Sequence, residues 1–227
     1  MQANELFDRP NTILLDGGMG TMLQAAGLKL GARPEELNIT DPALIEGIHG
    51  QYAAAGSRIV NANTFGASAH KLAGSTYTLE QVITAGIENC KRACAPYGAL
   101  TALDVGPLGE LLEPSGTLAF EDAVAEYARI VKAGEAAGAD LIFFETYTDL
   151  YELKAALLAA KENTHLPILA SMSFEAGGRT FTGCTVESFG VTARGLGANA
   201  VGINCSLGPK EIFPMAKRLA EAVPGDF

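Results

Sequence analysis

The chain has 227 residues, of which 48% are hydrophobic and 19% charged, a composition typical of a folded globular protein. Its formal net charge is −10 and it has no basic run, so we expect neither nucleic acid nor an anionic membrane surface as a partner. Four cysteines are too few for a disulfide scaffold, no apolar run approaches the roughly 20 residues that cross a bilayer, and the first residues are polar. We therefore expect reduced thiols and a cytoplasmic protein.

Short apolar runs rich in β-branched residues recur along the chain, each with the length of a buried parallel strand. Helix starts lie between them: Asp41 before Pro42 is an N-cap with a first-turn proline, and Thr78–Gln81 and Asp149–Glu152 have the pattern of capping boxes. Parallel strands need crossover connections, so this alternation predicts an α/β fold with helices outside a parallel sheet. The six predicted strands are Thr12–Leu15, Arg58–Ala62, Leu100–Val105, Leu141–Phe144, Pro167–Ser171 and Ala200–Asn204.

Two architectures fit this alternation: an open doubly wound sheet and a closed (β/α)8 barrel. The loop after the first predicted strand, Asp16–Thr21, is not a dinucleotide fingerprint, because Leu23 stands where the third glycine belongs. A barrel instead predicts polar residues at the carboxyl ends of several strands. Taken singly, each is better explained as a loop residue that caps the next helix; together they favour a site. These residues are Asp16, Asn63, Asp104, Glu145, Ser173 and Cys205.

The number of strands falls short of a full barrel. The residues after Ser206 suffice for one helix, over Pro209–Val223, and for no further strand. We therefore predict an incomplete (β/α)8 TIM-barrel type with about six βα units present and strands seven and eight missing. An open six-stranded sheet is the alternative.

Four segments at or beyond the predicted strand ends form a pattern when taken together: Leu14–Thr21, Asn61–Gly66, Phe144–Thr146 and Gly202–Pro209. In order and spacing they resemble the homocysteine S-methyltransferase family, and most of all the N-terminal homocysteine modules of cobalamin-dependent methionine synthases. The similarity covers essentially the whole chain. It implies that residues 1–227 form one homocysteine-binding domain that is truncated before the family's Gly-Gly-Cys-Cys motif.

The resemblance implies a zinc ion held by three cysteine thiolates at the mouth of the barrel. Cys205 matches the first ligand, and the other two family ligands would lie beyond residue 227. A free thiol, with a pKa of about 8.5, is mostly protonated at neutral pH, whereas zinc would hold the substrate sulfur as a nucleophilic thiolate. The implied reaction is transfer of a methyl group to homocysteine, giving methionine.

The same resemblance assigns roles to the other motif residues. Asp16 and Glu145 would meet the substrate ammonium or orient its neighbours, since carboxylates form charge-assisted hydrogen bonds. The backbone N–H groups of Gly17 and Gly18 would bind the substrate carboxylate. Two more candidate mouth residues, for which a purely structural role is equally open, are Asn63 and Asn204.

Several functional alternatives stay open. The favoured methyl donor by resemblance is methylcobalamin, supplied by folate and cobalamin domains of a larger methionine synthase, but betaine and S-methylmethionine serve related enzymes. Alternatively, the chain is an inactive fragment or binding module that needs its missing part, or an unrelated barrel enzyme for an acidic or phosphorylated metabolite. Among the remaining thiols, Cys90 and Cys94 continue an apolar helix stripe and are expected to be buried, and Cys184 is expected to be a bystander.

Overall fold

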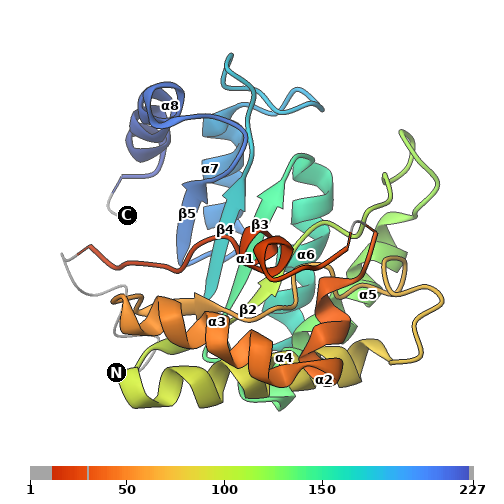
Figure 1. Cartoon of the computed structure of the whole chain (residues 1–227). Helices are drawn as coiled ribbons and strands as arrows, with labels where there is room; N and C mark the ends of the chain where they lie inside the picture. The colour runs from red at the N-terminus through yellow and green to blue at the C-terminus, as the bar shows by residue number, and fades with distance from the viewer. Residues whose placement is uncertain (1–11, 30, 225–227) are drawn as a thin grey trace.

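A computed structural model of the chain describes residues 12–29 and 31–224. Its sheet has the order β1-β2-β3-β4-β5, and every neighbouring pair is parallel. The spatial order follows the chain order with no reversal, which is the arrangement of a barrel and not of a doubly wound sheet. This confirms the predicted fold class as an incomplete barrel (Figure 1). The strands are β1 (Ile59–Asn61), β2 (Leu100–Val105), β3 (Leu141–Tyr147), β4 (Ile168–Met172) and β5 (Ala200–Ile203).

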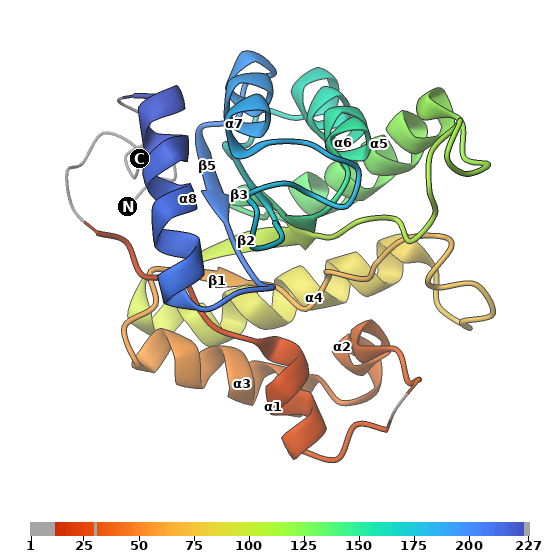
Figure 2. The ribbon, with the colours of Figure 1, turned by 90° about the horizontal axis from the view of Figure 1, so that it is seen from above.

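Helices follow one another around the outside of the curved sheet, as the view from above shows for α4 to α7 (Figure 2). Successive helices contact each other from α3 through α8. None of the helices in the described part of the chain is long and apolar enough to cross a membrane. The α-helices are α1 (Met19–Ala25), α2 (Leu37–Thr40), α3 (Pro42–Ala54), α4 (Leu79–Cys94), α5 (Phe120–Ala136), α6 (Leu150–Asn163), α7 (Val186–Gly195) and α8 (Pro209–Ala222), with 3-10 turns at Pro34–Glu36 and Ala95–Tyr97.

The first predicted strand is wrong in its extent. Over Thr12–Leu15 the structure has only an isolated parallel bridge between Leu15 and Ile59, extended by a hydrogen bond of 2.8 Å from the Arg58 N–H to the Leu14 carbonyl. The segment runs beside β1 in the place of a first strand, but no described strand pairs with its other side, and Leu14 is 57% exposed. The segment therefore occupies the position of a first strand without forming a regular ladder.

The two faces of the sheet bury different clusters because successive strand residues point to opposite sides. Along β2 and β3, Leu103 and Phe144 face the helices and join the large core. Leu100 and Phe143 face the barrel interior and join a much smaller apolar cluster. The inner face is therefore the thinly covered one, and any cavity of the molecule is expected there.

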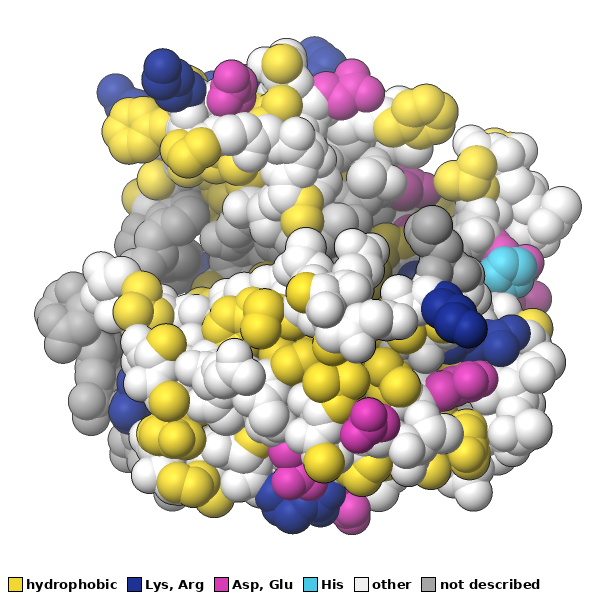
Figure 3. All heavy atoms as spheres, viewed as in Figure 1, with side chains coloured by type: hydrophobic (Ala, Val, Ile, Leu, Met, Phe, Trp, Pro, Cys, Tyr) yellow, Lys and Arg dark blue, Asp and Glu magenta, His cyan; other side chains and the backbone are white. Residues whose placement is uncertain are grey.

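A third apolar cluster holds the N-terminal layer together. Leu23 of α1 packs against Ile45 and Ile48 of α3, and all three side chains are buried. Figure 3 shows hydrophobic side chains on the lower half of this face, over the α1–α3 layer, where partly buried members of the cluster reach the surface. This layer carries the glycine loop that precedes α1.

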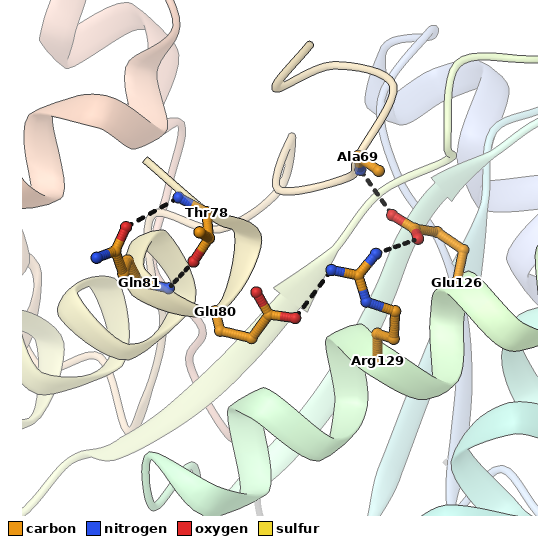
Figure 4. A network of polar contacts seen from close by, with 6 residues as sticks. All are labelled: Ala69, Thr78, Glu80, Gln81, Glu126 and Arg129. Atoms are coloured by element: carbon orange, nitrogen blue, oxygen red, sulfur yellow. Dashed lines mark hydrogen bonds and ion pairs between the residues drawn. The ribbon is translucent and has the colours of Figure 1, made fainter. Parts of the chain in front are cut away.

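The predicted helix starts are largely confirmed. Thr78 and Gln81 form a reciprocal capping box, with the Gln81 N–H donating to Thr78 Oγ1 (3.2 Å) and the Thr78 N–H donating to Gln81 Oε1 (2.9 Å; Figure 4). Asp149 caps α6 as expected. Glu152, however, does not close a second box. It is buried, and its carboxylate accepts hydrogen bonds from the N–H of Leu108 (2.7 Å) and the Tyr127 hydroxyl (2.9 Å).

Polar contacts join α4 to α5 on the outside of the barrel (Figure 4). Arg129 of α5 donates to Glu80 at the start of α4 (2.9 Å) and to Glu126 on its own helix (3.3 Å). Glu126 in turn accepts a hydrogen bond of 2.6 Å from the Ala69 N–H. Exposed ion pairs contribute little to stability. The hydrogen bond from Ala69 to Glu126 also ties the segment between β1 and α4 to α5.

Candidate functional site

A cavity of about 780 Å³ lies on the inner face of the sheet and opens at the carboxyl ends of the strands. This is the end at which barrel enzymes place their active sites. Every residue to which the sequence assigns a role lines this one cavity: Asp16, Gly17, Gly18, Asn63, Glu145, Asn204 and Cys205.

Among residues 12–29 and 31–224, four carboxyl groups line the cavity. Three of them form what we call the acidic wall, Asp16, Asp104 and Glu145, and the fourth is Glu35 of the 3-10 turn. Asp16 follows the segment beside β1, and its Oδ2 accepts a hydrogen bond of 2.9 Å from the Asn61 N–H. Burial raises the pKa of Asp16 from 3.8 to about 7, against the opposing effect of that hydrogen bond. No lysine, arginine or histidine is among the described residues that line the cavity.

The other two carboxyl groups of the acidic wall, Asp104 and Glu145, are close enough to affect each other's pKa. Burial, followed by repulsion from the carboxylates of Glu145 and Asp16, holds the pKa of Asp104 well above its ordinary range. Burial likewise raises the pKa of Glu145. A cavity that gathers acids without a counter-ion is suited to a cationic group, since an ammonium would relieve this repulsion.

The neighbouring part of the lining, which we call the thiol wall, consists of Thr146, Asn204 and Cys205. The Asn204 amide nitrogen donates to Thr146 Oγ1 (2.7 Å) and to Cys205 Sγ (3.4 Å), and it also reaches Glu145 Oε2 in the acidic wall (3.1 Å). Asn204 therefore connects the two walls directly.

The backbone of the thiol wall is unusual. Thr146 has a φ of 65°, and Cys205 and the following Ser206 have φ values of 59° and 61°. Residues with a Cβ are rarely found in this left-handed region, and such conformations gather at functional sites where the surrounding structure holds them. They turn the ends of β3 and β5 toward the cavity.

The described cysteines do not fit a complete zinc site. Cys205 is exposed at the cavity. Cys90 and Cys94 are buried, as predicted, and their sulfurs lie 3.8 Å apart. Cys184 lies in a separate shallow depression beside α7. Within residues 12–29 and 31–224, no group of three or more His, Cys, Asp or Glu side chains is arranged to hold a metal ion. Cys205 thus offers one thiolate of the three that the sequence resemblance implies.

The glycine loop comes close to the N-terminal layer. A side chain at Gly17 would lie 3.0 Å from the Tyr52 ring, whose hydroxyl donates to the Gly18 carbonyl (3.3 Å). No described residue accepts a hydrogen bond from the N–H of Gly17 or Gly18. Both donors are therefore available to an anionic group in the cavity.

Asn63 has a largely structural environment. Its side-chain amide donates to the Pro34 carbonyl (2.8 Å) and to Asn38 Oδ1 (2.9 Å), while Asn38 donates back to the Asn63 carbonyl (2.8 Å). Both amide hydrogens of Asn63 are used in holding this segment against the end of β1. These hydrogen bonds favour a role for Asn63 in holding the fold over a role in binding substrate.

Sequence reasoning left several lining residues without a role. The sequence predicts Asp104 at a strand end but assigns it no function. Three further lining residues are predicted only as parts of motifs: Asn61, Phe65 and Thr146. Phe65 packs directly on Gly106, where a Cβ would lie 2.5 Å from its ring. Their positions just before or after the carboxyl ends of strands were the available signal.

Comparison with known proteins agrees with this geometry. The family model for homocysteine S-methyltransferase matches residues 13–225. Methionine synthase of Mycobacterium tuberculosis (strain ATCC 25618 / H37Rv) is 30% identical over 225 residues, covering 90% of this chain and 19% of that protein. Methionine synthase of Mycobacterium leprae (strain TN) is 30% identical over 228 residues, covering 91% of this chain and 18% of that protein. The chain therefore spans about a fifth of the length of these curated relatives.

Solved structures show the same fold. The metallated form of the homocysteine methyltransferase MmuM from Escherichia coli superposes with a TM-score of 0.86 at 22% identity, covering 96% of this chain and 83% of that one. Its apo form gives a TM-score of 0.76. The family match extends over nearly the whole chain, and the strand order and the cavity at the strand ends agree with it. The chain belongs to the homocysteine S-methyltransferase family.

Proposed function

We propose that the chain binds homocysteine in the cavity and presents its thiol for methylation, giving methionine. The observation that carries this proposal is the lining itself: carboxyl groups without a counter-ion, two free glycine N–H groups and an exposed thiol lie on one cavity. The ammonium and carboxylate of an amino acid complement the acids and the glycine N–H groups, and its side chain would then lie near Cys205. The family match supports the same substrate.

In this proposal two carboxylates of the acidic wall, Asp16 and Glu145, hold the substrate ammonium. Asp16 is oriented by the Asn61 N–H, and Glu145 by the Asn204 amide, so both carboxylates are held before the substrate arrives. The N–H groups of Gly17 and Gly18 take the substrate carboxylate. The amino-acid part is then anchored at two points, and its side chain extends toward the thiol wall.

The thiol wall lies where the substrate sulfur would react. A zinc ion there would stabilise the sulfur as a thiolate. Because the described residues do not complete a three-thiolate site, we propose that Cys205 contributes one ligand and that the other two are not among the described residues. We further propose a methyl donor carried by other domains, methylcobalamin by resemblance, with betaine or S-methylmethionine as alternatives.

A second candidate function follows from the same metal-site mismatch. The chain would act as a homocysteine-binding module whose methyl transfer requires a further part of the barrel. The two candidates share the cavity and differ only in whether this chain alone transfers a methyl group. Substrate binding is therefore the property to measure first.

The experiment is a calorimetric titration of homocysteine into the wild-type chain and into Glu145→Ala. Loss of a charged hydrogen-bond partner is expected to weaken binding roughly 10- to 100-fold. The control is Glu175→Ala, which removes an equal charge from an exposed position away from the cavity and leaves affinity unchanged. Wild-type protein that binds homocysteine no better than alanine contradicts the proposed function, and an unaffected Glu145→Ala variant removes Glu145 from the site.

A further inference from the structure

Buried polar atoms without partners are rare in proteins, so each one calls for an explanation. Among the described residues, such side-chain atoms belong to His49, Asn61 and Asp104. His49 lies in α3, away from the cavity. The Oδ1 atoms of Asn61 and Asp104 are both hydrogen-bond acceptors, and both residues line the cavity.

Asp104 is held firmly in place. It is the penultimate residue of β2 and only 6% exposed. Its backbone N–H lies 3.1 Å from the Thr64 hydroxyl, and that hydroxyl donates to its carbonyl (2.8 Å). The main chain is thus satisfied on both sides. The carboxyl group has a hydrogen-bond partner in the Glu145 carboxyl group, but its Oδ1 atom has none.

The charges around this carboxyl group are nearly all negative. Asp16, Glu145 and Glu35 face it from the segment beside β1, from β3 and from the 3-10 turn. One cation, Lys71, interacts electrostatically with Asp104 but is not part of the lining: its Nζ donates to the Pro107 carbonyl (2.6 Å) and lies 5.1 Å from the centre of the Phe65 ring. Within the described residues, nothing in the cavity neutralises Asp104.

We propose that Asp104 is a third carboxylate of the substrate site and that its Oδ1, together with Asn61 Oδ1, accepts hydrogen bonds from the substrate ammonium. An ammonium group has three N–H donors and one positive charge, so it satisfies both orphaned acceptors and offsets the repulsion among the acids. The inference rests on the proposed function, because it takes the amino-acid substrate from there. It assigns to Asp104 and Asn61 a role beyond that of Asp16 and Glu145.

This role predicts selectivity for the amino group and not merely for the amino acid's shape. The test compares homocysteine with 4-mercaptobutanoate, which keeps the carboxylate, the carbon chain and the thiol but has no ammonium. Both ligands are titrated by calorimetry into the wild-type chain and into Asp104→Asn. We expect the variant to bind homocysteine roughly tenfold or more weakly and to bind 4-mercaptobutanoate at least as well as the wild type does.

The matched control is Asp122→Asn, which removes the same charge from an exposed position in the first turn of α5 and is expected to change neither affinity. Asp104→Ala provides a second variant with the same expected selectivity, and thermal melts confirm that each variant is folded. Asn61→Ala is expected to give a smaller loss with the same preference for homocysteine.

The outcomes separate the two levels of inference. Equal losses for both ligands in Asp104→Asn and Asp104→Ala would mean that Asp104 only supports the fold, and unchanged homocysteine affinity would mean that it has no part in binding; either result overturns the inference and leaves the proposed function standing. A wild-type chain that binds neither ligand overturns the proposed function, and this inference with it.

Discussion

The acidic wall and the thiol wall line the same cavity but are built in different ways. The acidic wall draws on the segment beside β1 and on the central strands β2 and β3, and Asp104 within it is almost fully buried. The thiol wall lies largely at the end of the edge strand β5, where Cys205 is exposed. One wall is destabilised by buried like charges, the other by left-handed backbone.

This difference shows how a binding site opposes folding in two independent ways. Carboxyl groups kept from solvent favour protonation, so their cost depends on pH. Backbone strain at Thr146, Cys205 and Ser206 has no such dependence. Asn204 hydrogen-bonds to both walls. Substitutions at Asn204, in the acidic wall and beside the thiol wall therefore separate the cost of buried charge from the cost of backbone strain.

Asn204→Ala is expected to have the largest effect of these substitutions. Its amide also accepts hydrogen bonds from the Thr146 N–H (3.3 Å) and the Ser171 hydroxyl (2.9 Å), so its loss leaves several partners unsatisfied. We expect the free energy of unfolding, measured in urea, to fall by about 2–3 kcal/mol. Asn163→Ala, which loses one hydrogen bond at the end of α6, is the control and should lose less than about 1 kcal/mol. Equal losses would show that the hydrogen bonds between the two walls through Asn204 add no measurable stability.

The regular part of the fold was predictable from the sequence because it depends on local pattern. The run Leu100–Val105 was predicted as a strand with the bounds that β2 has. Of the six polar residues predicted at strand ends, five line one cavity; Ser173 does not, and its hydroxyl donates to the Asn204 carbonyl (2.9 Å) instead. The extent of Thr12–Leu15 was wrong because apolar, β-branched composition does not reveal how many ladder hydrogen bonds a segment makes with its neighbour.

Features that depend on distant contacts could not be predicted. Asn63 is held by Asn38, which is 25 residues away along the chain, so its structural role has no local signal. The left-handed φ of Thr146 and Cys205 occurs without the glycine that usually marks it. The orphaned oxygen of Asp104 is visible only once its neighbours have been placed.

The pH dependence of stability distinguishes the acidic wall from the thiol wall. Burial raises the pKa of Asp16 from 3.8 to about 7, so the folded chain binds more protons than the unfolded chain between these values. The stability that this proton provides is present below about pH 4 and is lost as the pH rises through about 7. We expect Asp16→Asn, which keeps an acceptor for the Asn61 N–H, to reduce the fall in unfolding free energy between pH 5 and pH 8 by about 1–2 kcal/mol. Urea titrations at both pH values measure this, and a slope like that of the wild type would contradict it.

Ser206→Gly is expected to have the smallest effect and to relieve strain beside the thiol wall without removing a site side chain. Ser206 is exposed and has a φ of 61°. A left-handed conformation costs a residue with a Cβ roughly 1–2 kcal/mol, of which the greater backbone entropy of glycine in the unfolded chain offsets about half. The variant should therefore be more stable by about 0.5–1 kcal/mol, seen as a rise in Tm of about 1–4 °C. Ser115→Gly, an exposed position without positive φ, should be neutral or destabilised. A similar response of the two variants would show that the turn after Cys205 stores no strain, and would leave like charge in the acidic wall as the main cost of the site.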